Sequence, residues 1–285
     1  MSTGRRLRIT HRTGYRYISP VQASFNEVRM TPRDADGQML LSHQLQVSPR
    51  ASVQAYVDYW GALVQSFDVH EEHEVLEIVA TSLVDVPRAA PELDGVGWNG
   101  VTAPAVIDRW GEFLVPTELV DDALSDPDRA SVVESLRGLA TPKDAIKGAV
   151  AAVRDRIRYD DAATGVTTTA GQAWAIGGGV CQDYSHTLLS LLRALHIPAR
   201  YVSGYLHTED EAPGQTVVGE SHAWIEVWNG GWEAYDPTND RSVGSAHVVV
   251  ARGRDYADVP PLKGIYAGGA SEALGVTVEI TQLAV

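Results

Sequence analysis

Cys181 could act as a nucleophile. It is the single cysteine among 285 residues, and it follows the glycine run 177–179 at the start of a segment whose apolar residues recur at helical spacing until Pro198. Unpaired backbone N–H groups and the helix dipole at such a position favour a thiolate over a thiol. Because a lone cysteine is more often a small buried hydrophobe, this position suggests nucleophilic chemistry without establishing it.

A histidine and an aspartate occupy two neighbouring segments that predict a β-hairpin. Residues 221–228 and 232–236 are rich in aromatic and β-branched side chains, and Asn229-Gly230-Gly231 separates them. An Asn-Gly pair between two such runs is a strong hairpin signal. His222 and Asp236 are therefore expected on adjacent antiparallel strands.

The length of the hairpin loop decides whether these two side chains can meet. With a three-residue loop, Trp228 lies opposite Trp232, and His222 lies diagonally from Asp236 on the same face. Diagonal neighbours are about 7–8 Å apart at the backbone, which is within reach of an imidazole and a carboxylate. A two-residue loop would put them on opposite faces. A working pair therefore predicts an odd-length loop or a bulge, with a glycine of the loop at positive φ.

These residues have the types that a Cys-His-Asp triad requires. Asp236 would accept a hydrogen bond from one ring nitrogen of His222, and the other nitrogen would take the proton of Cys181. The thiolate would attack a carbonyl carbon and form a thioester. The backbone N–H of Cys181 would hold the oxyanion, with the side chain of Trp174 or Gln172 as second donor. Taken singly, His222 and Asp236 also fit an ordinary hairpin with a half-buried histidine and a turn-capping aspartate.

The remaining pattern predicts an α+β protein with a β-rich N-terminal part. In the first third of the chain, short alternating apolar runs are interrupted by prolines and glycines, which favours an antiparallel sheet or sandwich. Between that part and the catalytic segment, short helices are expected around Val120 and Val132. We expect an N-terminal β-rich domain over residues 1–110 and a catalytic domain over residues 111–285 that ends in strands.

Two longer helices are predicted in the catalytic part. Thr141 is a suitable N-cap for the first, with Pro142 in its first turn and Asp144 near the positive end of the dipole. The second begins at Cys181. Its inner face is predicted to carry side chains at helical spacing: Tyr184, Ser185, Leu188, Leu192 and Leu195. A strand is predicted over residues 199–206.

Charge and hydropathy restrict the partners and the location. The 37 acidic residues against 23 basic ones give a net charge of −14, and no basic patch offsets it, so no nucleic-acid partner is expected. No stretch approaches the roughly 18 apolar residues that cross a bilayer, so no membrane partner is expected. Arg5-Arg6 is not followed by the apolar core of about 7–15 residues that a secretory signal needs. A single cysteine excludes an internal disulfide, and a cytoplasmic location is expected.

No cofactor or metal ion is expected. Residues 70–74 read His-Glu-Glu-His-Glu but lack the His-Glu-x-x-His spacing of a metalloprotease helix, and a solvated edge or turn is the expected structure. The glycine run 177–179 lacks the Gly-Lys-Ser/Thr ending of a phosphate-binding loop. With one cysteine, a cysteine-rich zinc site is impossible.

Several blocks of the sequence resemble the bacterial transglutaminase-like proteins. In order, they are Gly178-Gly179-Val180-Cys181-Gln182-Asp183-Tyr184-Ser185-His186, Gly204-Tyr205, Ser221-His222-Ala223-Trp224 and Tyr235-Asp236-Pro237-Thr238-Asn239. The resemblance continues toward the C-terminus at Gly253-Arg254-Asp255-Tyr256. In the N-terminal half it includes Met30-Thr31-Pro32-Arg33 and Asp58-Tyr59-Trp60-Gly61, although Ala62 stands where an asparagine is usual. The resemblance covers nearly the whole chain.

The resemblance implies a papain-like α+β core preceded by an antiparallel, sandwich-like β domain. It also implies that Cys181, His222 and Asp236 form the catalytic triad. The wider superfamily contains cross-linking enzymes, peptidases, amidases and proteins without catalysis, and a shared fold does not choose among them.

Three functions therefore remain open at the level of sequence. The leading hypothesis is hydrolysis of an amide or peptide bond through a thioester, because water is the default acceptor at a site that does not exclude it. The second is acyl transfer to an amine, either Gln–Lys cross-linking or a small-molecule ligation. The third is a non-catalytic binding module. The expected partner is a peptide, a protein or a small amide substrate.

Overall fold

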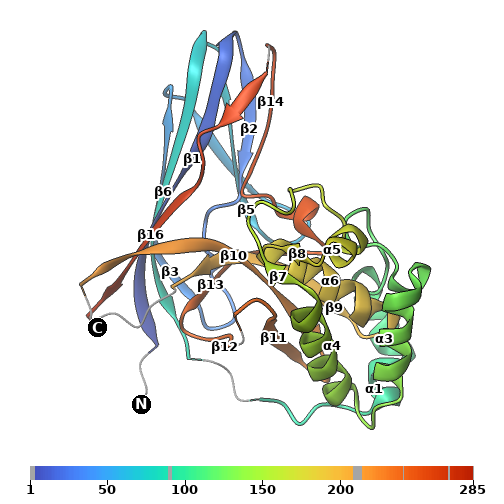
Figure 1. Ribbon diagram of the computed structural model, residues 1–285. Helices are drawn as coiled ribbons and strands as arrows, with labels where there is room; N and C mark the ends of the chain where they lie inside the picture. Colours follow the sequence, from blue (N-terminus) through green and yellow to red (C-terminus); the bar gives the residue numbers. More distant parts are fainter. Residues whose placement is uncertain (1–3, 89–91, 208–213, 240, 269, 285) are drawn as a thin grey trace.

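The first part of the chain is β-structure, as predicted. The computed structural model describes residues 4–88, 92–207, 214–239, 241–268 and 270–284. Its N-terminal strands are β1 (Arg5–Val21), β2 (Ser24–Val28), β3 (Met39–Ser48), β4 (Val53–Val57), β5 (Leu63–Val69) and β6 (His73–Val86). Buried and more exposed residues alternate along β6, the period expected when one face of a sheet packs on a core. In Figure 1, the long strands β1 and β6 rise away from the helices.

The later strands complete the same sheets. They are β9 (Ala199–Leu206), β10 (Thr216–Trp228), β11 (Trp232–Asp236), β12 (Arg241–Ser242), β13 (His247–Gly253), β14 (Leu262–Tyr266), β15 (Ser271–Ala273) and β16 (Thr277–Leu283). Among the described residues, the large sheet has the order β12-β11-β10-β16-β1-β6-β3, with β9 and β13 joined beside β10 and β15 beside β1. A second sheet has the order β14-β2-β5-β4.

Strand β16 links the N-terminal sheet to the strand that carries His222. Ile280 of β16 is paired with Ile9 of β1 on one side and with Val217 of β10 on the other. Strand β10 therefore begins in the N-terminal sheet and continues between β9 and β11, and it is longer than the predicted run 221–228. The C-terminal strand β16 thus pairs with the N-terminal β-structure. The domain boundary expected near residue 110 stays a prediction.

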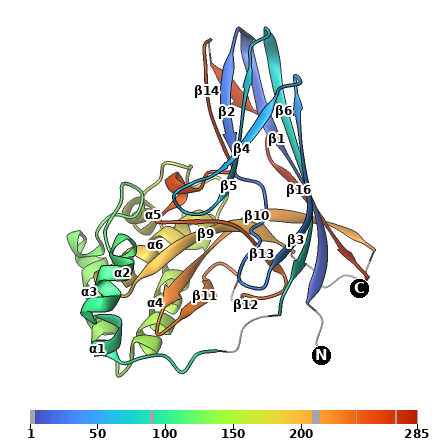
Figure 2. The ribbon, with the colours of Figure 1, turned by 180° about the vertical axis from the view of Figure 1, so that it is seen from behind.

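The helices lie together on one side of the molecule (Figure 2). They are α1 (Trp98–Val101), α2 (Pro104–Trp110), α3 (Pro127–Arg137), α4 (Pro142–Arg156), α5 (Ala170–Ile176) and α6 (Cys181–Ala194). The predicted start of α4 is confirmed, because Thr141 Oγ1 accepts a hydrogen bond from the N–H of Asp144 and Pro142 opens the helix. Val132 lies in α3, also as predicted.

The short helix expected around Val120 is present only as a 3₁₀ turn at Ala123–Ser125, and Val120 itself is not helical. The N–H of Thr117 donates to the carbonyl of Val120, and the N–H of Val120 donates to Thr117 Oγ1, so this segment closes as a turn. Val120 is nevertheless buried in the main core. Its apolar side chain reflected burial and not helical structure, because one apolar residue carries no periodicity.

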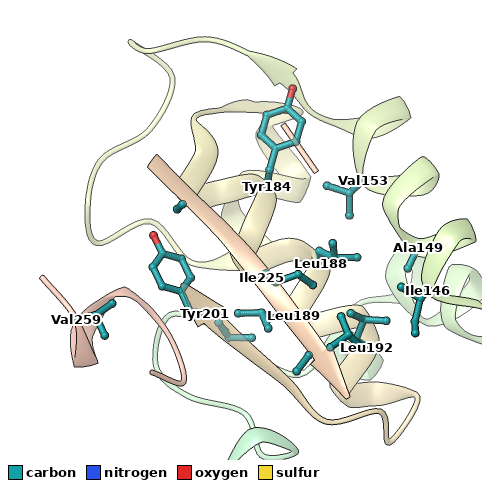
Figure 3. Packing of buried hydrophobic residues seen from close by; sticks show 14 of the residues in the cluster. Ile146, Ala149, Val153, Tyr184, Leu188, Leu189, Leu192, Tyr201, Ile225 and Val259 are labelled. Carbon is teal, nitrogen blue, oxygen red and sulfur yellow. The ribbon is translucent and has the colours of Figure 1, made fainter. Parts of the chain in front are cut away.

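Helix α6 is the centre of the core. The predicted inner face is buried, but so is every other residue from Gln182 to Ala194. The strands β9 and β10 cover one side, and α3, α4 and α5 contact the others. In Figure 3, Leu188 and Leu192 of α6 lie between Ala149 of α4 and Ile225 of β10. The helix that starts at Cys181 is therefore held on all sides.

No helix within the described residues combines the length and hydropathy that a bilayer crossing needs.

Candidate active site

Cys181 is the first residue of α6, as the sequence predicts. The preceding Gly178–Gly179 segment (β8) pairs in parallel with Arg158–Tyr159 (β7), so the chain enters the helix from a fixed strand. A Cβ on Gly179 would come within 2.5 Å of a carboxylate oxygen of Asp183, so a side chain has no room there. Asp183 Oδ2 accepts hydrogen bonds from the N–H of Val180 at 2.8 Å and from Thr164 Oγ1 at 2.6 Å. These contacts fix the start of the helix and leave Cys181 partly exposed.

The hairpin has the predicted three-residue loop. Trp228 pairs with Trp232, and Gly230 has a φ of +88°, a value that favours glycine. Because the loop has an odd number of residues, His222 of β10 and Asp236 of β11 lie diagonally on the same face of the hairpin. His222 Nε2 lies 2.9 Å from Asp236 Oδ2, and both side chains are almost completely buried. The predicted contact is thus confirmed, while the catalytic roles of the two residues stay predictions.

Asp236 is held by donors on both of its oxygens. The N–H groups of Thr238 and Asn239 donate to Oδ1 at 3.0 and 3.2 Å. Asn239 Nδ2 donates to Oδ2 at 3.1 Å, and His222 and His247 also contact Oδ2 through their Nε2 atoms. Burial alone would raise the pKa of Asp236, but these hydrogen bonds hold it well below its usual range. The carboxylate is therefore an anion with a fixed orientation.

The surroundings of His222 favour its charged form. Burial lowers the pKa of His222, but the hydrogen bond to Asp236 and the interaction with Cys181 outweigh burial and raise the pKa to about 10. Nδ1 is the ring nitrogen left for Cys181, and it makes no hydrogen bond within normal geometric limits in the described part of the chain. Catalytic pairs are often long before substrate binds. An imidazolium beside Cys181 would stabilise a thiolate.

The two predicted oxyanion donors differ in their surroundings. Gln172 is exposed, and its Oε1 accepts from the N–H of Thr169 at 3.0 Å in the capping box that begins α5. Trp174 is 6% exposed, and its indole Nε1 has no hydrogen-bond partner among the described residues. Arg156 donates to the backbone carbonyl of Trp174 at 2.7 Å and lies over its ring. The indole N–H of Trp174 is therefore buried without a competing partner in the described structure, whereas the side chain of Gln172 caps a helix at the surface.

The structure adds a residue that the sequence patterns did not identify. His247 begins β13, and its Nε2 lies 3.2 Å from Asp236 Oδ2. His247 comes 11 residues after Asp236. No local spacing links it to the hairpin, since strand β9 lies between β13 and β10.

His222, Asp236 and His247 also have the ligand types of a metal site. Their nearest ligand atoms all lie within 4.8 Å of one another. A cavity of about 760 Å³ lies beside this group and is lined in part by Asp236 and His247. Arg33 and Arg252 also line it, whereas Cys181 does not.

The His-Glu-Glu-His-Glu segment forms no such group. His70 is exposed, as expected, but His73 is buried, which corrects the expectation of a solvated edge. One ring nitrogen of His73 contacts Ser24 Oγ at 3.2 Å and the other lies 2.8 Å from the carbonyl of Glu71. The alternation of β6 turns this residue inward, where two polar partners compensate for its burial.

Comparisons with known proteins agree with this architecture. The family described as bacterial transglutaminase-like N-terminal region matches residues 7–85, and the transglutaminase-like superfamily matches residues 130–237. A protein of Mycobacterium leprae is 41% identical over 280 residues, which cover 98% of this chain and 99% of that protein. A protein-glutamine gamma-glutamyltransferase of Pseudomonas aeruginosa is 28% identical over 142 residues, covering 46% of this chain and 20% of that protein.

A solved structure extends the likeness to the fold. A candidate cysteine protease from Cytophaga hutchinsonii aligns with a TM-score of 0.78 at 23% identity, covering 100% of this chain and 92% of the other. This alignment confirms the predicted fold class, an α+β core with a β-rich N-terminal region.

Proposed function

Because this chain belongs to the bacterial transglutaminase-like proteins, we propose that it hydrolyses an amide or peptide bond through a thioester on Cys181. The observation that carries the proposal is the buried hydrogen bond between His222 Nε2 and Asp236 Oδ2, which leaves Nδ1 for the thiol at the start of α6. A buried imidazolium-carboxylate pair beside a helix N-terminus is the environment that activates a cysteine.

The first half of the reaction forms the thioester. Sγ of Cys181 attacks the substrate carbonyl carbon, and the carbonyl oxygen becomes an oxyanion. The backbone N–H of Cys181 and the indole N–H of Trp174 donate to that oxygen. The C–N bond then breaks, and His222 gives its Nδ1 proton to the leaving amine, so that the amine departs neutral.

The second half releases the acid. Neutral His222 takes a proton from water, and the resulting hydroxide adds to the thioester carbonyl. The C–S bond breaks, the carboxylic acid leaves, and the thiolate and imidazolium are restored. Asp236 remains ionised throughout, because its role is to hold the ring and to stabilise the imidazolium.

Acyl transfer to an amine is the second candidate. Its support is the similarity of part of this chain to a protein-glutamine gamma-glutamyltransferase. The thioester step is the same, and a primary amine then replaces water as the nucleophile. The two reactions differ only in product, so a product assay separates them.

The first test is alkylation of Cys181 by iodoacetamide across a pH series. Every alkylation event reports on this residue, because the chain has one cysteine. A thiol paired with an imidazolium should react well below about pH 8.5, where a free thiol begins to ionise, and His222→Ala should remove that advantage. His73→Ala is a matched control, because His73 is also buried but lies in the N-terminal β-structure. Reaction that follows an ordinary thiol in the intact protein would favour a non-catalytic binding module.

The second test identifies the acceptor. Glutamine-containing peptides and simple amides would be incubated with and without a primary amine, and products would be identified by mass spectrometry. A carboxylic acid in both conditions supports hydrolysis, and an amine adduct supports transfer. Trp174→Phe keeps the ring but loses its N–H, and it should lower turnover by about 10²-fold. Its alkylation profile should match that of the intact protein.

A further inference from the structure

A second imidazole contacts the carboxylate of Asp236. His247 Nε2 lies 3.2 Å from Asp236 Oδ2, and His222 Nε2 lies 2.9 Å from the same oxygen. The side chains of both histidines are 1% exposed, and that of Asp236 is fully buried. One carboxylate oxygen therefore serves two buried rings.

The hydrogen bonds around His247 define where its proton lies. The N–H of Gly244 donates to Nδ1 of His247 at 3.4 Å, so this nitrogen is an acceptor and the ring proton is on Nε2. Burial lowers the pKa of His247, although the hydrogen bond to Asp236 opposes this effect and the charges of His222 and Arg241 reinforce it. His247 is thus a neutral ring that donates to Asp236.

The proton on Nε2 of His247 favours hydrogen bonding over metal binding for the group formed by His222, Asp236 and His247. A metal ion would need the Nε2 lone pair of His247, and that position carries a proton directed at Asp236. Asn239 Nδ2 supplies a further donor to the same carboxylate oxygen. The observed distances, all between 2.9 and 3.2 Å, are those of hydrogen bonds.

An aromatic side chain holds the two rings in place. Trp224 stacks on His222 with ring centroids 6.0 Å apart, and it meets His247 edge-on at 5.3 Å. Trp224 is completely buried. His247 is the first residue of β13, and the pairing of β13 with β9 fixes the backbone from which its ring extends.

We propose that His247 is a positioning residue that orients Asp236 toward His222. The proposal rests on the proposed function, because it concerns the same thiol. The N–H groups of Thr238 and Asn239 hold Oδ1, and the donor from His247 acts with Asn239 Nδ2 to keep Oδ2 at the position to which His222 also donates. Fixing Oδ2 fixes the tautomer of His222 and keeps its Nδ1 directed to Cys181.

The test compares two substitutions of His247 by the rate of Cys181 alkylation. His247→Leu removes the donor and keeps an apolar side chain of moderate size, whereas His247→Gln keeps an N–H donor near the position of Nε2. At about pH 6.5, where reaction depends on the imidazolium, the leucine variant should react about tenfold more slowly. At about pH 10.5 a thiol ionises without help, so the rates should agree within about twofold.

Glutamine should restore most of the rate at the lower pH. His73→Leu is the matched control, because it also removes a buried histidine and one hydrogen bond to a side chain, that of Ser24. The ratio of its alkylation rates at the two pH values should equal that of the intact protein. Thermal unfolding of each variant would identify any general loss of stability, which changes both rates together.

The possible results separate this inference from the proposed function. If the intact protein and His222→Ala react alike at the lower pH, the triad itself fails. If His222 matters but the leucine variant keeps the ratio of the intact protein, His247 has no positioning role. A glutamine variant as slow as the leucine variant would also overturn the inference, because the donor would then be irrelevant.

Discussion

Replacing Asp236 by asparagine should impair the thiol while preserving the shape of the site. Asn has the same number of heavy atoms, and its carbonyl oxygen can still accept from the N–H groups of Thr238 and Asn239. Its amide nitrogen would then occupy the position of Oδ2, where His222 and His247 both donate. Asn239 Nδ2 also donates to this position, so three donors would face the new amide N–H, and these side chains must change tautomer, flip or move.

The size of the effect follows from the charge of His222. Burial lowers its pKa, and the contacts with Asp236 and Cys181 bring it to about 10 against an ordinary value of 6.5. An adjacent opposite charge typically contributes about 1–3 pKa units, and each unit corresponds to about 1.4 kcal/mol. Loss of the Asp236 charge should therefore weaken the imidazolium by at least about 1.4 kcal/mol. That free energy lowers the equilibrium constant for the thiolate–imidazolium pair over the neutral thiol–imidazole pair by about tenfold, and the alkylation rate near pH 6.5 should decrease with it.

The assay is the pH profile of iodoacetamide alkylation, followed by intact mass. Asp58→Asn is the control, since Asp58 is a well-buried carboxylate that accepts from Arg29 at 3.0 Å in the N-terminal part. The control should keep the profile of the intact protein. An Asp236→Asn variant that alkylates at the normal rate near pH 6.5 would refute the assigned role of the carboxylate.

Three further predictions concern stability. Glu226→Gln should lower the free energy of unfolding in urea by about 3 kcal/mol. Arg200 and Arg252 lie 2.7 and 2.8 Å from the carboxylate of Glu226, and without it the buried Arg252 would keep only the exposed Asp36 as a charged partner among the described residues. An unchanged unfolding midpoint would contradict this. Burial raises the pKa of Glu226, but the two arginines outweigh burial and lower it, so the folded state gains stability that is complete above the unfolded pKa of 4.5 and is lost as pH falls below it. The difference between the intact protein and Glu226→Gln should therefore shrink as pH falls below about 5, and a constant difference would argue against the ion pair. Gly179→Ala should lower the free energy of unfolding by about 1–3 kcal/mol, because the new Cβ would lie 2.5 Å from the carboxylate of Asp183. Thermal unfolding would measure this, and a variant of normal stability would show that the carboxylate can move freely.

The hairpin shows how far local sequence can determine a site. The spacing of His222 and Asp236 around Asn229-Gly230-Gly231 predicted the hairpin and left two registers open. A working pair required the odd-length loop, and the structure has that loop and the contact. Antiparallel pairing across a short loop is set by residues that are close in sequence. The start of α6 at Cys181 was predictable for the same reason, because glycines, a helix start and a period of 3.6 all lie within one segment.

The environment of α6 was only partly predictable. Its inner face was identified, but burial of its whole circumference was not. Polar residues outside the predicted inner face, such as His186, Ser190 and Arg193, gave the helix an amphipathic appearance, and these side chains are in fact buried. Arg193 donates to the backbone carbonyl of Ala199 and to that of Arg254, contacts that no helical period predicts.

The sequence by itself determined the fold class, the position of the cysteine at a helix start and the possibility of a histidine-aspartate contact, because each depends on spacings within one or two adjacent elements. Only the tertiary structure decided that β16 lies between β1 and β10 and that His247 reaches Asp236. Both arrangements depend on the order of strands in a sheet, which non-local packing selects. Alternation along a strand tells which side chains share a face, but it does not tell which strand will be the neighbour.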